Sequence, residues 1–284
     1  MHVRIATCKV LPEPDVDEAL LLAALTARGL RPRMVAWDDP EVDWDEPVPT
    51  VIRSTWNYIH DLAAFNAWVT RAARAAPLWN PPDVVQWNAH KSYLDELAAR
   101  RCPVVPTAFY TRGTPVVELS VDLAKMGFGE IVVKPTVGAG SFATRRFGAS
   151  AEEREQAATF LRELLAERDV MVQAYVPSVE THGERSLVFI DGAITHAMRK
   201  SPRFSGQDES VTGPHPISPD ERRLAEQALA PWADRLLYGR VDMAPDADGK
   251  PMIMELELIE PSLFLLQHPP ATERLVSAVL SRVG

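Results

Sequence analysis

The first third of the chain alternates short strand-like segments with longer helix-like ones, and this order leaves few folds open to it. The strand-like segments are the apolar, β-branched runs Val3–Ala6, Met34–Trp37 and Thr50–Arg53. Helical spacing of apolar residues follows at 15–28, which closes at Gly29, and again at 61–75. Strands separated by helices are typical of a parallel sheet covered by helices. We therefore expect an N-terminal α/β domain over residues 1–90.

The rest of the chain has a more antiparallel character. A proline-rich stretch at 78–107 indicates a domain junction. Asp191-Gly192 lies between two apolar runs and predicts a β-hairpin over 184–200, and a second hairpin is expected over 239–264. Capping signals predict helices at 150–167 and from 218 onward, and residues 270–283 are expected to close the chain as a further helix.

The stretch EIVVKPTVGAGSFATRRF, residues 130–147, places Lys134 at the end of a buried strand and directly before a glycine-rich loop. A lysine held there is a fixed cation, and the backbone N–H groups of a loop with Gly138, Gly140 and Ser141 can turn towards an anion. The pattern is not a Walker A motif, in which the lysine follows the loop. It predicts a phosphate-binding loop; the alternative is an ordinary hairpin whose lysine is solvated.

Three carboxylates are expected on one face of the second hairpin. Strand periodicity aligns Glu255 with Glu257, and an even-length loop brings Asp242 to the same side. The opposite side is expected to be filled by Met252, Met254, Leu256 and Leu258. Carboxylates crowded in this way repel one another unless a cation lies among them, and hard oxygen ligands suit Mg²⁺. The alternative is a solvated acidic face.

Taken together, these motifs resemble the ATP-grasp ligases. Their order along the chain is Lys91 in NAHKSYL, Lys134 in VVKPTVGAGS, then MVQAYVP, GERSLVF, MRK and the acidic hairpin, over roughly residues 85–262. The resemblance implies an α/β (α+β) architecture. It would consist of a Rossmann-like N-terminal domain at 1–90, a central subdomain with the glycine loop at 91–175, and a C-terminal subdomain with the metal site at 176–284.

The resemblance also implies ATP and Mg²⁺ as cofactors and assigns roles to residues. Lys91 and Lys134 would contact the ATP phosphates, and Glu184, or else Glu180, would hold the ribose. The adenine would lie against the backbone of Gln173, Ala174, Tyr175 and Val176. Arg199, with Lys134, would act on the transferred phosphate. The family's metal ligands are usually Asp, Glu and Asn, corresponding here to Asp242, Glu255 and Glu257, so that a glutamate stands in place of the asparagine.

Within this superfamily the phrases RSTWNY, LWNPP, WNAHKSYL and ELELIEPSLFL are most similar to the cycloserine-forming cyclo-ligases, along nearly the whole chain. The resemblance implies closure of O-ureido-D-serine, or a close analogue, into an isoxazolidinone ring such as D-cycloserine. The substrate carboxylate would first accept the γ-phosphoryl group of ATP, and a nitrogen of the same molecule would then displace phosphate. Catalysis by positioning and charge neutralisation is general for phosphoryl transfer.

Substrate-binding residues are expected at the end of the third N-terminal strand, because parallel sheets bind ligands at the carboxyl ends of their strands. The candidates are Arg53, Ser54, Thr55, Trp56 and Asn57, together with Ser262 beyond the acidic hairpin. An arginine there could grip a substrate carboxylate; the alternative is a structural ion pair. The polar segment 201–217 has neither helical nor strand pattern and is expected to be a lid.

Composition narrows the classes of partner. The formal net charge of −9 gives no basic surface, so nucleic acid is not expected. No apolar run approaches the roughly 20 residues that span a bilayer, and the N-terminus lacks a signal-peptide pattern, so we expect a cytosolic protein without membrane contact. Cys8 and Cys102 are expected to be buried thiols. The expected partner is a small amino-acid-like substrate. Whether the protein forms a homodimer is left open by the sequence.

Three functions remain as hypotheses at this point. The first is an intramolecular cyclo-ligase. The second is a ligase that joins two amino acids or modifies a peptide, and the third is a nucleotide-binding regulator without turnover. The complete set of lysines and carboxylates argues against the third, because a site without turnover has no need of its metal ligands.

Overall fold

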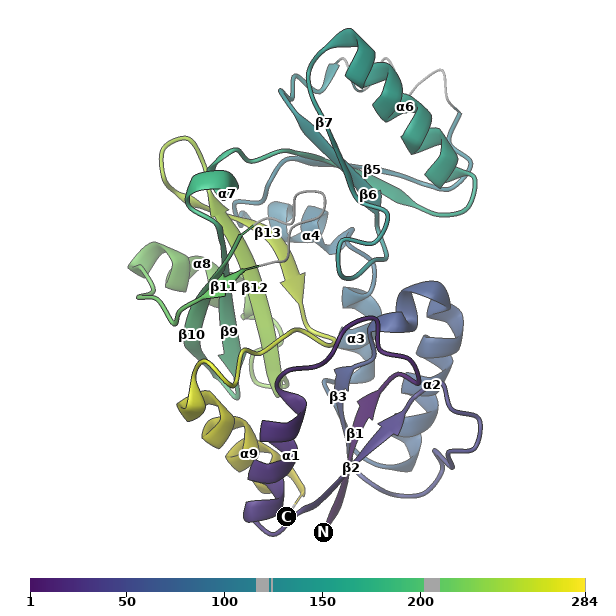
Figure 1. The fold of residues 1–284 in the computed structure, drawn as a ribbon, viewed down its shortest axis with the longest axis vertical. Coiled ribbons are helices and arrows are strands. Elements are labelled where there is room, and N and C mark those ends of the chain that lie inside the picture. Colours follow the sequence, from purple (N-terminus) through teal and green to yellow (C-terminus); the bar gives the residue numbers. More distant parts are fainter. Residues whose placement is uncertain (116–122, 124, 202–209, 284) are drawn as a thin grey trace. The chain divides into compact units, whose positions relative to one another are not determined.

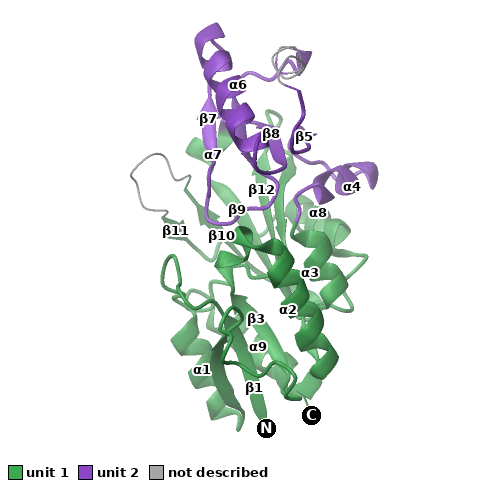
Figure 2. Cartoon of the chain, turned by 90° about the vertical axis from the view of Figure 1, so that its right-hand side faces the viewer, with its two compact units in different colours: residues 1–89, 178–284 green, residues 90–177 purple. Residues whose placement is uncertain are grey.

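The structure is a computed structural model that describes residues 1–115, 123, 125–201 and 210–283. These residues form two compact units, one made of 1–89 with 178–284 and the other of 90–177 (Figure 2). The first and last stretches of the chain therefore belong to one unit. The division into three domains at residues 90 and 175 stays a prediction. Of the helices that the structure describes, none has both the length and the apolar character needed to cross a bilayer.

The N-terminal part of the first unit is a parallel sheet, as predicted. Its strands follow the order β2-β1-β3-β4, and each neighbouring pair is parallel (Figure 1). The elements are β1 (His2–Thr7), α1 (Glu18–Ala27), β2 (Arg31–Ala36), β3 (Thr50–Ser54), η1 (Trp56–His60), α2 (Leu62–Ala75), β4 (Leu78–Trp79) and α3 (Pro82–Asn88). The first helix begins three residues later than expected because Asp15 and Asp17 form a turn, in which Asp17 N donates to Asp15 Oδ1 (3.0 Å).

The C-terminal part of the same unit is a five-stranded sheet with the order β11-β10-β9-β12-β13, antiparallel throughout. Its elements are α7 (Ser178–Thr181), β9 (Glu184–Ile190), β10 (Ala193–Lys200), β11 (Val211–Thr212), α8 (Pro219–Leu229), β12 (Tyr238–Pro245), β13 (Pro251–Glu257) and α9 (Pro269–Val283). Asp191 and Gly192 both have positive φ (46° and 83°), which a two-residue turn between β9 and β10 requires. Both predicted hairpins and the capping box of Ser218 with Glu221 are confirmed.

The second unit is a four-stranded antiparallel sheet with the order β5-β8-β6-β7. Its described elements are α4 (Tyr93–Ala99), β5 (Thr107–Tyr110), β6 (Ile131–Pro135), β7 (Arg145–Phe147), α6 (Ala151–Leu165) and β8 (Val170–Ala174). Helix α6 starts where predicted, with Ser150 accepting a hydrogen bond from Glu153 N (3.2 Å). Alternate strand residues such as Ile131 and Val133 pack in one core with Leu161 of α6. Lys134 therefore lies on the opposite face of this sheet.

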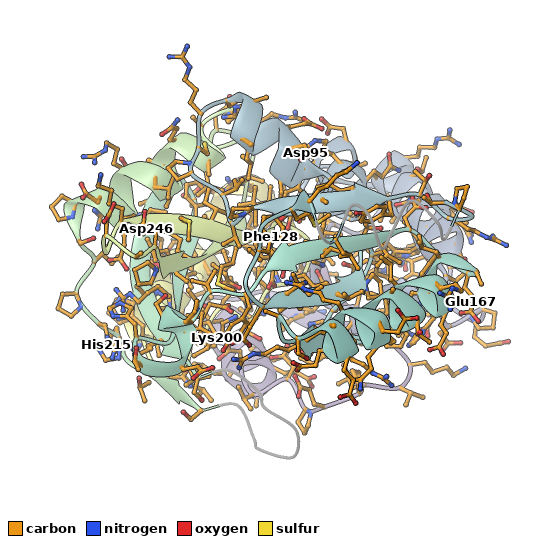
Figure 3. All side chains as sticks on the ribbon, turned by 90° about the horizontal axis from the view of Figure 1, so that it is seen from above. Asp95, Phe128, Glu167, Lys200, His215 and Asp246 are labelled. Carbon is orange, nitrogen blue, oxygen red and sulfur yellow. The ribbon has the colours of Figure 1, made fainter. Side chains whose placement is uncertain are left out.

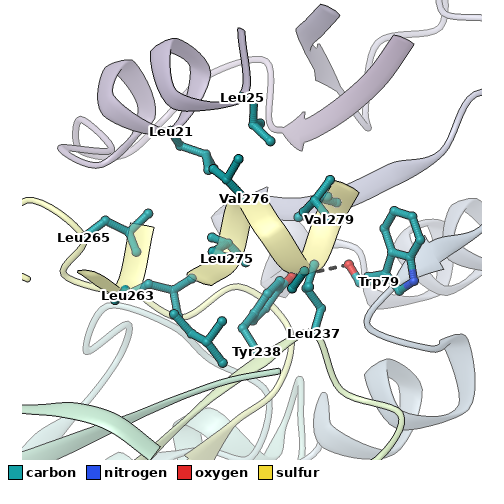
Figure 4. Close-up of a cluster of buried hydrophobic side chains, with 14 of the residues drawn as sticks. Leu21, Leu25, Trp79, Leu237, Tyr238, Leu263, Leu265, Leu275, Val276 and Val279 are labelled. Atoms are coloured by element: carbon teal, nitrogen blue, oxygen red, sulfur yellow. Dashed lines mark hydrogen bonds between the residues drawn. The ribbon is translucent and has the colours of Figure 1, made fainter. Parts of the chain in front are cut away.

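One hydrophobic core connects the two sheets of the first unit. Val51 of β3 and Val188 of β9 belong to it, and α9 packs against α1 through Val276 and Leu21 (Figure 4).

Polar contacts reinforce the junction between the two sheets. Asn80 is fully buried; its amide donates to Tyr238 O (2.8 Å) and Leu258 O (2.7 Å), and its oxygen accepts from Leu237 N (2.8 Å). The Tyr238 hydroxyl donates to Ile259 O (2.8 Å) and contacts Ile52 O.

We expect Asn80→Ala to lower the free energy of unfolding by about 3 kcal/mol, because it leaves three buried backbone groups without their partner. Urea unfolding followed by circular dichroism measures the loss. Gln267→Ala, at an exposed position, is the control and should change stability little. Equal stability of the two variants would show that Asn80 does not hold the sheets together.

A buried histidine on β10 makes the stability of the first unit depend on pH. His196 is 3% exposed and its Nε2 lies 3.0 Å from Leu263 O. Burial, with His268 beside it, lowers its pKa from 6.5 to about 4. Below pH 6.5 the unfolded chain therefore binds more protons than the folded one, and stability falls until the pH reaches the folded pKa. We expect a loss of about 2 kcal/mol between pH 7 and pH 5 by linkage. Urea titrations at both pH values measure it, and an unchanged pH dependence in His196→Gln would contradict this origin.

Candidate functional site

The hairpin of β12 and β13 brings its acidic residues to one face of the sheet, as the sequence predicted. Asp242 pairs directly with Glu255, and Arg240 pairs with Glu257. A register shift follows Asp242, so the inward-pointing residue beyond it is Ile253, which is fully buried. The expectation that Met252 and Met254 would fill the opposite side is wrong at these two positions; both are half-buried, because the bulge reverses the alternation of the strand.

Two protein cations lie among these carboxylates. The Arg240 guanidinium donates to both oxygens of Asp242 (2.9 and 2.8 Å) and contacts Glu257. The Lys200 ammonium lies 3.0 Å from Asp242 and also contacts Glu184 (Lys200 is labelled in Figure 3). From the sequence, only a metal ion was expected to offset the carboxylate charge. In the structure, a guanidinium and an ammonium offset part of that charge.

The charges of this cluster are strongly coupled. Although burial opposes it, Arg240 and Lys200 hold the pKa of Asp242 far below its usual range. Burial raises the pKa of Glu257 to about 8, and Asp242 and Glu255 add to the rise. Burial likewise raises the pKa of Glu184 to about 7, against the attraction of Lys200. Carboxylates outnumber cations here, so a further positive charge would stabilise the cluster.

The donor set fits a metal ion at two of the three predicted ligands. Glu255 and Glu257 are two residues apart on one strand, face the same side, and repel each other enough to help raise the pKa of Glu257. A divalent cation between them would remove that repulsion. Asp242, at 2% exposed, is instead held by Arg240 and Lys200. Across residues 1–115, 123, 125–201 and 210–283, no three His, Cys, Asp or Glu side chains are grouped so as to hold a metal ion by themselves.

Arg199 does not join this cluster. It pairs with Arg185 across the β9–β10 ladder, whereas its neighbour Lys200 pairs with Glu184. Consecutive strand residues point to opposite faces, so Arg199 lies on the α8 side of the sheet, where Arg185 binds Glu221 (2.7 Å). Its placement gives no support to the predicted role on the transferred phosphate, and Lys200 is the cation that lies beside the carboxylates.

In the second unit, the glycine loop and Lys91 come together. Lys91 is 7% exposed; its ammonium donates to Gly138 O (2.7 Å), and its backbone N–H donates to Thr136 O (2.9 Å). The loop backbone is left-handed at Gly140 (φ 56°) and Ser141 (φ 61°). Only glycine adopts this conformation readily, so Ser141 is a strained position of the type found at ligand sites. Lys134 lies at the other end of the same loop.

The segment expected to hold adenine ends β8 and continues beyond it. Gln173 is buried, and its side chain donates to Thr107 Oγ1 (3.1 Å). The backbone N–H groups of Ala174 and Tyr175 already donate to Pro106 O (2.8 Å) and Glu130 O (2.9 Å). Of the four residues, Val176 is therefore the best placed to offer its backbone to a base.

The expected substrate residues divide into two groups. Arg53 Nη1 donates to Pro261 O (3.0 Å), Trp56 Nε1 to Glu260 O (3.2 Å), and Ser262 O accepts from Arg240 (3.2 Å). This first group thus meets the chain just after the acidic hairpin. In the second group, the Ser54 hydroxyl donates to Thr7 (2.8 Å), and Asn57 donates to Asp38 (2.7 Å).

Arg53 keeps two hydrogen-bond donors open in this region. It is 1% exposed, yet among the described residues neither Nε nor Nη2 has a hydrogen-bond acceptor, and the buried hydroxyl of Thr55 also lacks a partner. The Tyr238 ring, 5.5 Å from the guanidinium, is its cation–π neighbour. Glu260 is 7% exposed and acts together with Arg53 on the pKa of Tyr238, so a buried carboxyl lies in the same region. The open Nε and Nη2 donors of Arg53 still fit a carboxylate ligand.

Residues 202–209 of the expected lid lie outside the described residues, and its role stays a prediction. The part that follows contains the short strand β11, where no strand was expected, paired with Arg199 and Lys200 of β10. Arg240 and Lys200 were missed as members of the charged cluster. Arg240 had a usable signal, because it lies two residues before Asp242 and so shares its face of the strand.

Comparison with known proteins finds relatives along nearly the whole chain. Residues 3–80 match the family described as D-cycloserine synthetase DcsG, N-terminal domain. The chain is 34% identical over 285 residues to the cycloserine biosynthesis protein DcsG of Streptomyces lavendulae, covering 95% of this chain and 94% of that one. The crystal structure of D-cycloserine synthetase DcsG matches all of both chains with a TM-score of 0.90 and 33% identity.

A more distant match bears on the fold alone. The ATP-grasp ligase PsnB, complexed with minimal precursor, Mg and ADP, has a TM-score of 0.65 and 18% identity, covering 98% of this chain and 96% of that one. The predicted ATP-grasp fold with a parallel N-terminal sheet is thereby confirmed.

Proposed function

Because the chain belongs to the family of the cycloserine biosynthesis protein DcsG and is an ATP-grasp ligase, we propose that it closes O-ureido-D-serine, or a close analogue, to D-cycloserine or the matching ring. The substrate carboxylate takes the γ-phosphoryl group of ATP, and the nitrogen on the side-chain oxygen of the same molecule then displaces phosphate. Hydrolysis removes the carbamoyl group carried by that nitrogen as carbon dioxide and ammonia, which leaves the N–H of the D-cycloserine ring. The observation that carries the proposal is the identity of 34% along 95% of the chain.

We assign the phosphates and the adenine of ATP to residues of the second unit, and the ribose to a residue of the first. Lys91, Lys134 and the N–H groups around Gly138, Gly140 and Ser141 would bind the phosphates, and the bond from Lys91 to Gly138 O supports this role. Val176 would offer its backbone to adenine, beside Gln173, Ala174 and Tyr175. Glu184 would hold the ribose. It shares a sheet face with Lys200, the cation that we assign to the transferred phosphate, whereas Glu180 is the exposed alternative.

We assign the metal to Glu255 and Glu257, with Asp242 as the predicted third ligand. Mg²⁺ would neutralise phosphate charge during the transfer. The chain's own contribution is the positioned pair Arg240 and Lys200. Asp242 holds both cations in place, so their N–H groups can stabilise charge on the phosphoryl oxygens without reorganisation. We transfer to Lys200 the role first expected of Arg199.

We assign the substrate carboxylate to Arg53 and Thr55, with Trp56 and Ser262 beside them and with Ser54 and Asn57 as supports. The open Nε and Nη2 donors of Arg53 and the unpartnered Thr55 hydroxyl together match the acceptor pattern of one carboxylate. A site built around one anion would suit a single amino-acid-sized molecule that carries both reacting groups. Holding both groups together avoids the entropy cost of a second substrate.

The test is ADP formation with O-ureido-D-serine as sole substrate in the presence of MgATP, with product masses recorded. We expect turnover without any second amine and a cyclic product. Turnover that appears only after an amino acid or peptide is added would overturn ring closure and leave an intermolecular ligase.

Arg53→Gln is expected to raise the KM for O-ureido-D-serine by at least about tenfold, because it removes the charge that holds the carboxylate. Arg222→Gln, at a half-exposed guanidinium on α8, is the matched control. Equal KM values in both variants would show that Arg53 does not bind the substrate.

A further inference from the structure

In the second unit, the sheet face of Lys134 carries an arginine to which no role has been assigned so far. Arg146 of β7 pairs with Val132 of β6, and Val132 pairs in turn with Gln173 of β8. Residues that pair across neighbouring strands point to the same face of a sheet, and so do residues two apart on one strand. Arg146 therefore lies on the face opposite α6, together with Lys134 and Gln173, which we assign to ATP.

The Arg146 guanidinium lies over the ring of Tyr175, at 3.6 Å from the ring centroid. This distance is that of direct contact in a cation–π pair. Strand β7 is an edge strand of its sheet, and Tyr175 is the residue directly after β8. The contact thus joins the edge of the sheet to the segment that we assign to adenine.

Glu130 holds both members of this pair. Its carboxylate accepts from Arg146 Nε, and its backbone carbonyl accepts from Tyr175 N (2.9 Å). The side chain and the backbone of one residue therefore keep the guanidinium and the ring against each other. We call Glu130, Arg146 and Tyr175 the Arg146 cluster.

The Arg146 cluster lies where the chain leaves the sheet. Strand β8 ends at Ala174, whose N–H donates to Pro106 O (2.8 Å), and the bond from Tyr175 N to Glu130 O follows. Val176, which we expect to offer its backbone to adenine, comes one residue after these two bonds. Chain segments at the ends of strands open easily unless further contacts hold them. By fixing the Tyr175 ring, Arg146 restricts the backbone directly before Val176.

The neighbouring arginine makes the same kind of contact on the other face of the sheet. The Arg145 guanidinium lies over the ring of Phe160, at 4.4 Å from its centroid, and Phe160 belongs to the core under α6. Arg145 therefore packs on the core of the unit, whereas Arg146 packs on the segment assigned to adenine. The two residues have the same charge and are adjacent in the chain, so each is a control for the other.

We propose that Arg146 is a positioning residue for the adenine of ATP. It holds the Tyr175 ring and so fixes the backbone of Tyr175 and Val176 before the base arrives. Fixing a binding segment in advance raises affinity, because less conformational freedom is lost on binding. The inference depends on the proposed function only through the assignment of ATP to residues of the second unit. Arg146 acts on the affinity for the base, while Lys91 and Lys134 bind the phosphates.

The test compares the Kd of MgATP with that of magnesium tripolyphosphate, which has the phosphates without the base. Both are measured by calorimetry on the full chain without O-ureido-D-serine. Arg146→Ala should raise the Kd of ATP by about fivefold and leave that of tripolyphosphate unchanged. Arg146→Lys keeps the charge but not the planar group that covers the ring, so its Kd for ATP should still be at least about threefold above the parental value.

Two further variants separate the contact with Tyr175 from the charge of the arginine. Arg145→Ala removes the same charge from the opposite face and should bind both ligands as the parent does. If Arg146 acts through the ring, adding Arg146→Ala to a Tyr175→Leu chain should weaken ATP binding no further. Circular dichroism verifies that each variant is folded.

A parental Kd for ATP in Arg146→Ala or in Arg146→Lys would overturn the proposal, as would equal weakening of tripolyphosphate. Full additivity of Arg146→Ala and Tyr175→Leu would also overturn it. Arg146→Lys decides the matter if tripolyphosphate binds too weakly to be measured. Because these measurements need no turnover, failure to close the ring would leave them intact. A parental Kd for ATP in Lys134→Ala would instead refute the phosphate assignment itself.

Discussion

Lys134→Ala is expected to lower ADP formation by about a hundredfold to a thousandfold, the usual effect of removing one positioned charge from a transfer site. Lys134 is the second-last residue of β6 and lies on the sheet face opposite α6, close to the loop whose Gly138 carbonyl binds the Lys91 ammonium. Alanine keeps the strand and removes only the cation. The rate of ADP formation and the Kd for ATP, measured by calorimetry, should both worsen.

Lys250→Ala is the control for this change, because Lys250 is exposed in the turn between β12 and β13. It should leave the nucleotide affinity and the rate as they are. Circular dichroism and thermal unfolding verify that both variants are folded. A folded Lys134→Ala chain with the parental Kd for ATP and the parental rate would remove Lys134 from the phosphate site.

Glu255→Gln is expected to raise the Mg²⁺ concentration needed for half-maximal activity by at least about tenfold, and to lower the rate at fixed Mg²⁺. The substitution keeps the volume and takes away a negative charge from the face it shares with Glu257. It also removes a repulsion that helps to raise the pKa of Glu257. Activity is measured as a function of Mg²⁺ concentration at saturating ATP.

The matched control is Glu226→Gln, an exposed carboxylate on α8 whose nearest basic partner, Arg222, is 3.9 Å away. Its Mg²⁺ dependence should coincide with that of the parent. If Glu255→Gln follows the same curve, Glu255 is not a metal ligand. The carboxylates of the acidic hairpin are then balanced by the protein's own cations alone.

Local patterns predicted a large part of this fold. The order of strands and helices, the turn at Asp191-Gly192 and the capping box at Ser218 each depend on residues within a few positions of one another. The facing of Asp242 and Glu255 also follows from local counting, since both lie close to the same turn. Such features can be predicted without knowing which distant segments of the chain come into contact.

Which residues make up the charged cluster could not be predicted from such local patterns. A register shift between Ile194 and His196 sets the alternation of the last residues of β10. It decides that Lys200, and not Arg199, faces Asp242, and nothing in the sequence marks the position of such a bulge. The same is true of Ile253, which takes the buried place expected of Met254.

What the sequence determined by itself was the class of chemistry: a lysine before a glycine loop, and carboxylates aligned on one hairpin. The tertiary structure alone decided which partners these groups have. Asn80 meets residues 237, 238 and 258 only because two sheets distant in the chain share one core. Arg53 keeps two open donors for the same reason, since its surroundings are built from segments some two hundred residues apart. Side-chain periodicity is a property of one strand, whereas the balance of buried charge belongs to the packed molecule.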